Sequence, residues 1–195
     1  MRPVIRANPG AMPAARLRLG WGRAALRVLL TLAALISLAS PSMAQEALSE
    51  YRLKAGVLYN FATFTEWPAG VGPTINLCIY GADPFDDALD ELQGKPVGRR
   101  SIALQRKTAL DALKGCQVVF VSAQGMRSFA RVMDELRQLP VLTVADSPGA
   151  ARQGAMLNML VSQGKVSFEA NLESARAARL VLSSRLLRLA VEVYQ

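Results

Sequence analysis

The sequence contains no histidine. Histidine is the side chain whose ordinary pKa lies closest to neutrality, and it is the usual base beside a catalytic serine or cysteine. Its absence excludes Ser-His-Asp and Cys-His pairs and the HExxH zinc site, and with them most hydrolase mechanisms. No other pair of nucleophile and base is recognisable in the chain. We therefore predict that the protein has no catalytic residues and is not an enzyme.

Nucleotide-binding fingerprints are also missing, because the chain has neither a GxGxxG nor a GxxxxGK[ST] segment. The turn from Gly81 to Pro84 could hold an anion, but an ordinary connection between a strand and a helix is the favoured interpretation. Asp86, Asp87, Asp90 and Glu91 share one short predicted helix, which is typical of a solvated acidic face. No further metal ligands converge on them, so we predict neither a cofactor nor a metal.

Acidic residues are absent from residues 1–44, which contain six arginines. An apolar run of about 12 residues, Val28 to Ala39, follows, whereas a helix that spans a membrane needs roughly 20. Ser42 and Ala44 then have the spacing of an A-x-A cleavage site. We predict a signal peptide over residues 1–44 that is cleaved after Ala44. An uncleaved membrane anchor is the alternative, and translation from Met12 would leave the same layout.

The net charge of +8 belongs mostly to this segment. Without its six arginines, 17 of the 23 basic residues remain against all 15 acidic ones, a net of +2. The remaining basic residues are interspersed with acids and not interleaved with stacking aromatics, so we predict no nucleic-acid partner. The mature part has no second apolar span and no Asn-x-Ser/Thr acceptor. We predict a protein of the bacterial periplasm that does not span a membrane after cleavage.

The mature chain alternates between helical and strand-like hydrophobic periods. Helices are expected at residues 45–65, 85–93, 108–114 and 127–139, and strands at residues 75–80, 101–105, 116–122 and 141–145. Residues 155–161 and 165–170 flank a Gly-containing turn and predict an antiparallel hairpin. An amphipathic helix over residues 172–193 closes the chain. We predict one α/β domain, residues 45–195, with a mixed, largely parallel β-sheet flanked by helices, a C-terminal antiparallel hairpin and a long closing helix.

The chain has only two cysteines, Cys78 and Cys116, and each lies in a predicted strand. In an exported protein, two thiols more often form a disulfide than remain free. Two reduced cysteines packed in the core are the alternative, because cysteine also behaves as a small hydrophobic side chain.

Several stretches resemble one family. The segment from Tyr51 to Pro68 is similar to the A-x-x-x-x-F-x-x-F-x-x-W-P opening of the YfiR-type periplasmic proteins. Residues 116–122, 141–146 and 165–171 resemble their C-x-V-x-F-I-S, L-T-V-x-D and V-x-F-E-I-N segments, and residues 178–190 resemble their closing helix. The order and spacing of these segments extend over nearly the whole mature chain.

The resemblance implies a periplasmic repressor that binds the periplasmic sensor domain of an inner-membrane diguanylate cyclase and lowers cyclic-di-GMP synthesis. It also implies sequestration by an OmpA-like outer-membrane lipoprotein and the formation of a homodimer. Cys78 and Cys116 correspond to a disulfide of the family. Some members carry a second cysteine pair near the positions of Ala151 and Asn158, which this chain lacks. A redox role that depends on the second pair is therefore not expected here.

For a repressor of this kind, exposed surfaces matter more than catalytic chemistry. Glu66, Trp67 and Pro68 place a large amphipathic ring beside a carboxylate at a helix end, and tryptophan is enriched at the centres of interfaces. A tryptophan that fills the core is the alternative. We predict partner binding by Glu66, Trp67, Pro68, Glu169 and Arg185.

Two polar residues near residue 170 have further interpretations. Asn171 is well placed to cap the closing helix. Glu169, on a predicted strand, could pair with Arg185 or Arg188, or it could face a partner.

Two functions other than repression stay open at this point. One is a periplasmic α/β domain that binds a small ligand and reports a solute to a partner, which requires a concave pocket with convergent polar groups. The other is a periplasmic enzyme, which the missing histidine disfavours.

The signal peptide leads to a first test. N-terminal sequencing of the exported protein should give Gln45 as the first residue, because cleavage after Ala44 follows from the A-x-A spacing. A first residue upstream of the apolar run would contradict cleavage and support the membrane anchor.

Overall fold

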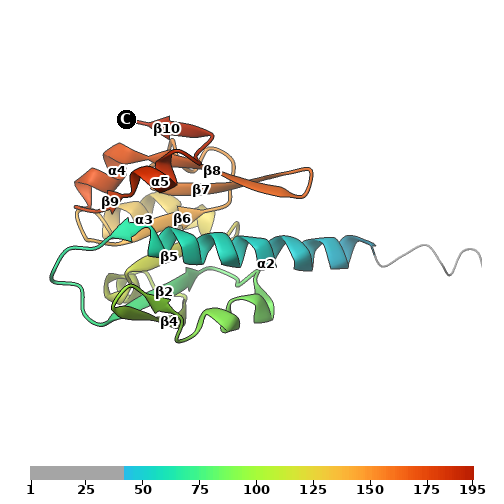
Figure 1. Ribbon diagram of the computed structural model, residues 1–195, viewed down its shortest axis with the longest axis horizontal. Helices are drawn as coiled ribbons and strands as arrows, with labels where there is room; N and C mark the ends of the chain where they lie inside the picture. The colour runs from blue at the N-terminus through green and yellow to red at the C-terminus, as the bar shows by residue number, and fades with distance from the viewer. Residues whose placement is uncertain (1–41) are drawn as a thin grey trace, which may run out of the picture. The chain divides into compact units, whose positions relative to one another are not determined.

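The computed structural model describes residues 42–195, so residues 1–41 of the predicted signal peptide over residues 1–44 lie outside the described residues (Figure 1). The first described element is helix α2 (Ser42–Thr63), where a helix was predicted. The proposed cleavage after Ala44 falls in the first turn of α2 and stays a prediction. Among the described helices, none is both long and apolar enough to cross a membrane.

Within residues 42–195, eight strands form one sheet in the order β10-β8-β7-β6-β5-β2-β4-β3. Neighbouring strands are parallel, except that β3 runs antiparallel to β4 and β7 to β8. The predicted mixed, largely parallel sheet and the predicted hairpin are therefore confirmed. The strands are β2 (Thr74–Tyr80), β3 (Pro96–Val97), β4 (Arg100–Lys107), β5 (Val118–Val121), β6 (Leu142–Ala145), β7 (Leu157–Ser162), β8 (Lys165–Asn171) and β10 (Glu192–Tyr194). Two short strands, β1 (Thr65–Glu66) and β9 (Val181–Leu182), form a separate antiparallel pair.

The central strands β2, β5 and β6 are buried on both faces, and their side chains alternate between two hydrophobic clusters. The larger cluster takes Ile75, Leu77, Ile79, Val118, Phe120, Leu142 and Val144. The smaller cluster takes Cys78, Tyr80, Val119, Val121 and Ala145. A sheet of this kind is stable only when other elements cover both faces.

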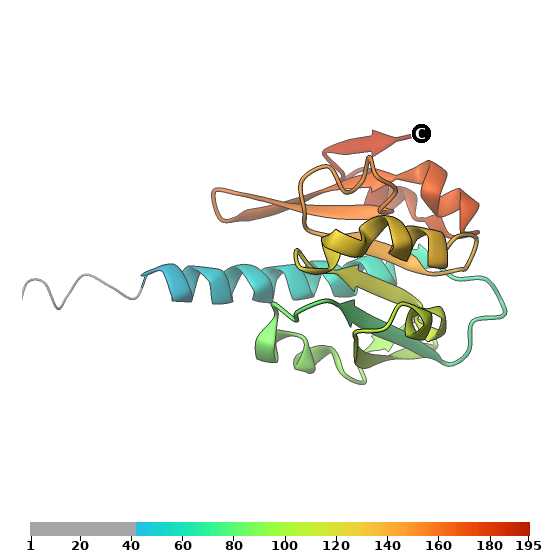
Figure 2. The same cartoon turned by 180° about the vertical axis from the view of Figure 1, so that it is seen from behind.

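Helix α2 covers the face of the larger cluster, and Figure 1 shows it in front of the sheet. Its residues Ala55, Leu58, Phe61 and Ala62 are buried, as the helical spacing predicted. The Phe61 ring packs edge-to-face on Phe168 of β8, with ring centroids 5.0 Å apart. The other face is covered by α3 (Phe129–Glu135), which is nearest to the viewer in Figure 2.

Three predicted helices are shorter or tighter than expected. In place of a helix over residues 85–93 there are two 3₁₀ turns, η1 (Asp86–Ala88) and η2 (Asp90–Leu92), because Asp86 has a φ of +46° that an α-helix cannot include. The helix expected over residues 108–114 is replaced by the 3₁₀ turn η3 (Asp111–Gly115). The helix expected over residues 127–139 is the 3₁₀ turn η4 (Gly125–Ser128) followed by α3. Short segments confined between strands adopt the tighter helix readily.

The prediction of a long closing helix was wrong. Residues 172–193 instead form helix α4 (Leu172–Ala177), strand β9, helix α5 (Ser184–Leu187) and strand β10. Helix α4 ends because Arg179 adopts a left-handed φ of +58°. The N–H of Leu180 then donates to the carbonyl of Ala175 at 2.9 Å, and that of Arg179 to the carbonyl of Arg176, also at 2.9 Å. These two bonds define a Schellman motif, which usually places glycine where this chain has Arg179.

Side-chain caps begin the two short helices. The Asn171 side chain accepts a hydrogen bond from the N–H of Ser174 at 2.9 Å, so the predicted cap is confirmed, although the helix that it starts is short. The Ser183 hydroxyl oxygen accepts from the N–H of Leu186 at 3.2 Å and starts α5. Each cap competes locally with continuation of the preceding element.

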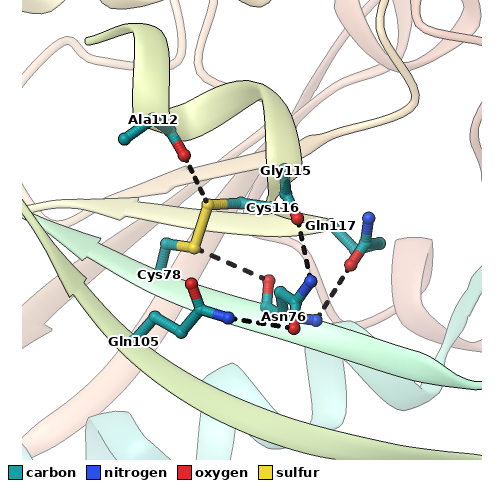
Figure 3. The surroundings of a disulfide bond; sticks show 7 residues. All are labelled: Asn76, Cys78, Gln105, Ala112, Gly115, Cys116 and Gln117. Atoms are coloured by element: carbon teal, nitrogen blue, oxygen red, sulfur yellow. Dashed lines mark hydrogen bonds between the residues drawn. A yellow bond between two sulfur atoms is a disulfide. The ribbon is translucent and has the colours of Figure 1, made fainter. Parts of the chain in front are cut away.

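Cys78 and Cys116 form a disulfide that joins β2 to the segment before β5 (Figure 3). Asn76 supports this connection: its side-chain amide donates to the carbonyl of Gly115 at 2.9 Å, and its backbone N–H donates to the Gln117 side chain at 2.9 Å. The disulfide closes a loop with a sequence separation of 38 residues. Such a cross-link stabilises the fold by roughly 4 kcal/mol on the chain-entropy account.

A buried ion pair fastens α2 to the end of β6. The Lys54 side chain is 5% exposed, and its Nζ lies 2.7 Å from Asp146 Oδ2 and 2.7 Å from Glu50 Oε1. Burial by itself would lower the pKa of Lys54, but the hydrogen bonds to Asp146 and Glu50 raise that pKa above its ordinary value. The ammonium also lies 4.4 Å from the ring centroid of Tyr51. This lysine on the apolar face of α2 is therefore fully partnered.

The disulfide can be tested by stability. Replacing both cysteines, Cys78→Ala with Cys116→Ala, should lower the free energy of unfolding by about 2 to 4 kcal/mol, because the unfolded chain regains the freedom that the cross-link removes. Chemical unfolding without reductant measures the difference. Reductant should lower the stability of the wild-type protein toward that of the double variant, and equal stability of the two proteins in its absence would contradict the expectation.

The ion pair can be tested in the same way. Lys54→Met should destabilise the fold by about 3 to 5 kcal/mol, because it leaves the nearly buried carboxylate of Asp146 without its cation. The double variant Lys54→Met with Asp146→Asn should recover most of this loss, because no charge is then left uncompensated.

The pH dependence is a second readout of this pair. Because the folded pKa of Lys54 is raised, its contribution should be fully present below the ordinary lysine pKa of 10.5 and should be lost as the pH rises through the folded value. The Lys54→Met variant should lack this alkaline slope. A double variant that is no more stable than Lys54→Met would contradict the interpretation.

Candidate functional site

The β1–β9 ribbon brings together surface residues from two distant parts of the chain. Thr65 pairs with Leu182, and both side chains are buried, whereas Glu66 pairs with Val181 and both are exposed. Val181 is 55% exposed, which is unusual for a valine in a strand. The ribbon therefore presents a carboxylate beside an apolar side chain.

Trp67 and Pro68 follow β1 and are both half-buried. The Trp67 indole N–H donates to the carbonyl of Ala62 at 3.3 Å, and the ring packs against the larger hydrophobic cluster. Part of the Trp67 side chain therefore packs on the core, as the alternative interpretation expected. The rest of this side chain is exposed, next to Glu66 in the chain.

Arg185 joins the same surface from α5. Its guanidinium lies 5.9 Å from the ring centroid of Phe64, and the N–H of Ser183 donates to the carbonyl of Phe64 at 3.0 Å. The structure thus places Arg185 beside the segment that carries Glu66, Trp67 and Pro68. We call the exposed parts of Phe64, Glu66, Trp67, Pro68, Val181 and Arg185 the ribbon surface.

Glu169 has a different position. Its residue is 9% exposed, and its carboxylate accepts from the Asn158 amide at 2.9 Å and from the Tyr194 hydroxyl at 3.1 Å. Of the two interpretations of Glu169, pairing with Arg185 or Arg188 is wrong, because neither pair is among the ion pairs of residues 42–195, and contact with a partner stays a prediction. The contact between Glu169 and Tyr194 could not be predicted from the sequence, because the segment that forms β10 was predicted to be part of a helix.

Tyr194 connects this buried carboxylate to the surface. The Arg152 Nε–H donates to the Tyr194 hydroxyl oxygen at 3.2 Å, and this bond raises the pKa of Arg152. Desolvation, together with nearby carboxylates, raises the pKa of Tyr194, although the bond from Arg152 acts in the opposite direction. The Arg152–Tyr194–Glu169–Asn158 chain fastens β10 to the sheet. Its Asn158 Oδ1 atom is buried and has no hydrogen-bond partner in the described part of the chain.

The turn after β2 is an ordinary connection. The Asp83 side chain accepts from the N–H of Phe85 at 2.9 Å and from the Arg106 Nε–H at 2.7 Å. An anion placed there would meet the carboxylate of Asp83, so the geometry favours the structural interpretation. Gly81 has a φ of +98°, and a Cβ on it would lie 2.4 Å from Ser122 Oγ, so this turn requires glycine for close packing. Over residues 42–195, no group of three or more His, Cys, Asp or Glu side chains is arranged to hold a metal ion.

Two solved structures share the fold at low sequence identity. A conserved domain protein from Vibrio cholerae aligns with a TM-score of 0.52 and 10% identity. An ABC domain from Streptococcus pneumoniae, solved in complex with L-Trp, aligns with a TM-score of 0.50 and 7% identity. Each alignment covers 73% of this chain and 60% of the other, so the chain spans less than two thirds of either structure. At this identity the likeness concerns the fold alone.

The family described as YfiR/HmsC-like matches residues 51–191 of the chain. The matched stretch runs from the middle of α2 to the residue before β10. It contains the disulfide, the buried Lys54–Asp146 pair and the ribbon surface. The chain therefore belongs to the YfiR/HmsC-like family.

Proposed function

We propose that this protein is a periplasmic repressor that binds the periplasmic sensor domain of an inner-membrane diguanylate cyclase and thereby lowers cyclic-di-GMP synthesis. The observation that carries the proposal is the YfiR/HmsC-like match over residues 51–191. Export by the predicted signal peptide would bring the protein to the compartment of that sensor domain. A protein that acts by binding a partner needs no catalytic imidazole.

The ribbon surface supports a role in binding. It combines an exposed valine with a partly exposed tryptophan and an arginine, and tryptophan and arginine are enriched among the residues that dominate the binding energy of protein interfaces. Its backbone is held by the β1–β9 pairing and by the bond from Ser183 to Phe64, so a partner would meet a preformed surface. Leu189 and Val191, which are 67% and 63% exposed, follow α5 and could extend the contact.

The five proposed partner-binding residues would act in two ways. Glu66, Trp67, Pro68 and Arg185 lie on the ribbon surface and would touch the sensor domain. Glu169 is nearly buried, so it would act indirectly by holding Tyr194 and β10 in place.

We further propose that an OmpA-like outer-membrane lipoprotein relieves repression by sequestering the protein, and that the protein forms a homodimer. Competition for the same surface would be the simplest physical route to relief, because one partner then excludes the other. Both proposals follow from the family and can be tested with the same purified protein.

The interface can be tested with charge substitutions on the ribbon surface. Val181→Asp and Arg185→Glu should each weaken binding to the purified sensor domain by about tenfold or more, which corresponds to about 1.4 kcal/mol. Binding would be measured by calorimetry, and cyclic-di-GMP levels in cells should rise in parallel. Trp67 is less suited to a first test, because its ring also packs on the core.

Val161→Asp is the matched control. Val161 is also an exposed strand valine, at 38%, but it lies in β7 near the tip of the hairpin, away from β9 in Figure 1. This variant should bind the sensor domain like the wild-type protein. Wild-type affinity of Val181→Asp and Arg185→Glu would remove the ribbon surface from the interface. Failure of the wild-type protein to bind the sensor domain would overturn the proposed function.

A further inference from the structure

A cavity of about 190 Å³ lies between the end of α3 and α4. Its walls come from the end of α3, the loop before β7 and the last turn of α4. The exposed residues Arg137, Gln153 and Ala177 contribute to its lining, so the cavity reaches the surface. No residue of the ribbon surface lines this cavity.

The floor of the cavity is apolar. Met133, Leu136, Met156 and Ala178 supply most of it, and Met156 is fixed by its backbone N–H, which donates to Thr143 Oγ1 at 3.1 Å. Methionine side chains adapt their shape to a bound apolar group. An apolar cavity of about 150 Å³ is known to hold a benzene-sized molecule, so this cavity is large enough for an apolar body of roughly six to eight carbon atoms.

Gly154 keeps the cavity open. Its φ is +109°, and a Cβ on it would lie 3.4 Å from Met133 Cε and 3.9 Å from Ser174 Oγ. A larger side chain at this position would therefore enter the space between the loop and the two helices. The absence of a side chain preserves room that core packing would otherwise fill.

Two residues in the left-handed conformation lie near the cavity, and Gln138 is the one of them that lines it. Gln138, just beyond α3, has a φ of +63°, and Arg179, just beyond α4, has a φ of +58°. Residues other than glycine rarely adopt this conformation, and at Arg179 it belongs to the Schellman motif that ends α4. Arg179 does not itself line the cavity, but its guanidinium donates to the carbonyl of Gln138, which does, at 3.4 Å, and this bond joins the ends of the two helices.

Two arginines lie at or beside the opening of the cavity. Arg137 lines the cavity and has an exposed ion pair with Asp134 at 2.7 Å. Over residues 42–195, no carboxylate lies within ion-pair distance of Arg179. A guanidinium with unused donors beside an apolar cavity fits a carboxylate, which accepts two parallel hydrogen bonds from it.

We propose that the cavity between α3 and α4 binds a small monocarboxylate, with its apolar body among the methionines and its carboxylate at Arg179 and Arg137. This site is separate from the ribbon surface, and its existence does not depend on the proposed repression of a cyclase. Because α4 leads directly through Arg179 to β9, a bound ligand would stiffen the segment from which the ribbon surface is built.

Methyl NMR of the exported protein tests the site directly, with sodium hexanoate as the probe. Millimolar hexanoate should shift the ε-methyl signals of Met133 and Met156, which line the cavity. The signals of Met126 and Met159, which do not line it, should stay in place and act as internal controls. Hexanol, which lacks the carboxylate, and acetate, which lacks the apolar body, should each bind at least about tenfold more weakly than hexanoate.

Three variants locate the binding groups. Ala177→Phe should abolish the shifts, because the ring fills the mouth of the cavity from an exposed position. Ala130→Phe introduces the same ring at an exposed α3 position outside the cavity and should leave hexanoate binding unchanged. Arg179→Asn should weaken hexanoate binding by about tenfold and leave hexanol binding unchanged, because asparagine tolerates the left-handed conformation but carries no charge.

Each outcome decides the proposal. Saturable shifts confined to Met133 and Met156 that are lost in Ala177→Phe would support it. Equal shifts of all the methionine methyls, or none at millimolar hexanoate, would overturn it. Equal affinity for hexanol and hexanoate would overturn the choice of a carboxylate. Thermal unfolding of the variants separates a lost site from a lost fold.

Discussion

The side chains of β2, β5 and β6 alternate between two hydrophobic clusters, so neither face of the central sheet can be left to solvent. This requirement determines where the other elements lie. Helix α2 must cover one face, and α3, together with the disulfide, must cover the other. Both covers are fastened by interactions that resist sliding: the Lys54–Asp146 ion pair holds α2 at the end of β6, and Cys78–Cys116 holds the segment before β5 against β2. The surfaces left over are the ones available for function.

The ribbon surface is a consequence of how α2 ends. The chain leaves α2 at Thr63 and pairs at once with β9, which puts Glu66 beside Val181. Burying Thr65 and Leu182 on the inner side of this pair forces the other two side chains outward. The β1–β9 backbone pairing stabilises the ribbon and does not require the Val181 side chain to be buried. Val181 can therefore stay exposed. A surface built in this way can be used by a partner without loss of the core.

The left-handed residue after α4 links the two candidate sites. Arg179 ends the helix, so that the chain can return as β9, and its guanidinium also bonds to the carbonyl of Gln138, which lines the cavity between α3 and α4. Had the helix continued, neither the ribbon nor the cavity wall would exist in this form. The strain of a non-glycine residue in this conformation is offset by the two hydrogen bonds of the Schellman motif and by burial of Leu180.

The sequence by itself determined the α/β class, the largely parallel sheet, the hairpin and the first helix, because hydrophobic period, proline and glycine are local signals. It also placed Asn171 as a cap and identified the family, since both depend on short motifs. It failed over residues 172–193, where Leu182, Leu186 and Leu189 keep a helical spacing although Leu182 is buried by pairing with β1 and Leu189 is exposed. Only the tertiary structure decided that Lys54 pairs with Asp146, that Glu169 accepts from Tyr194 and that Arg185 lies beside Phe64. Those contacts join residues far apart in the chain, and local periodicity carries no information about them.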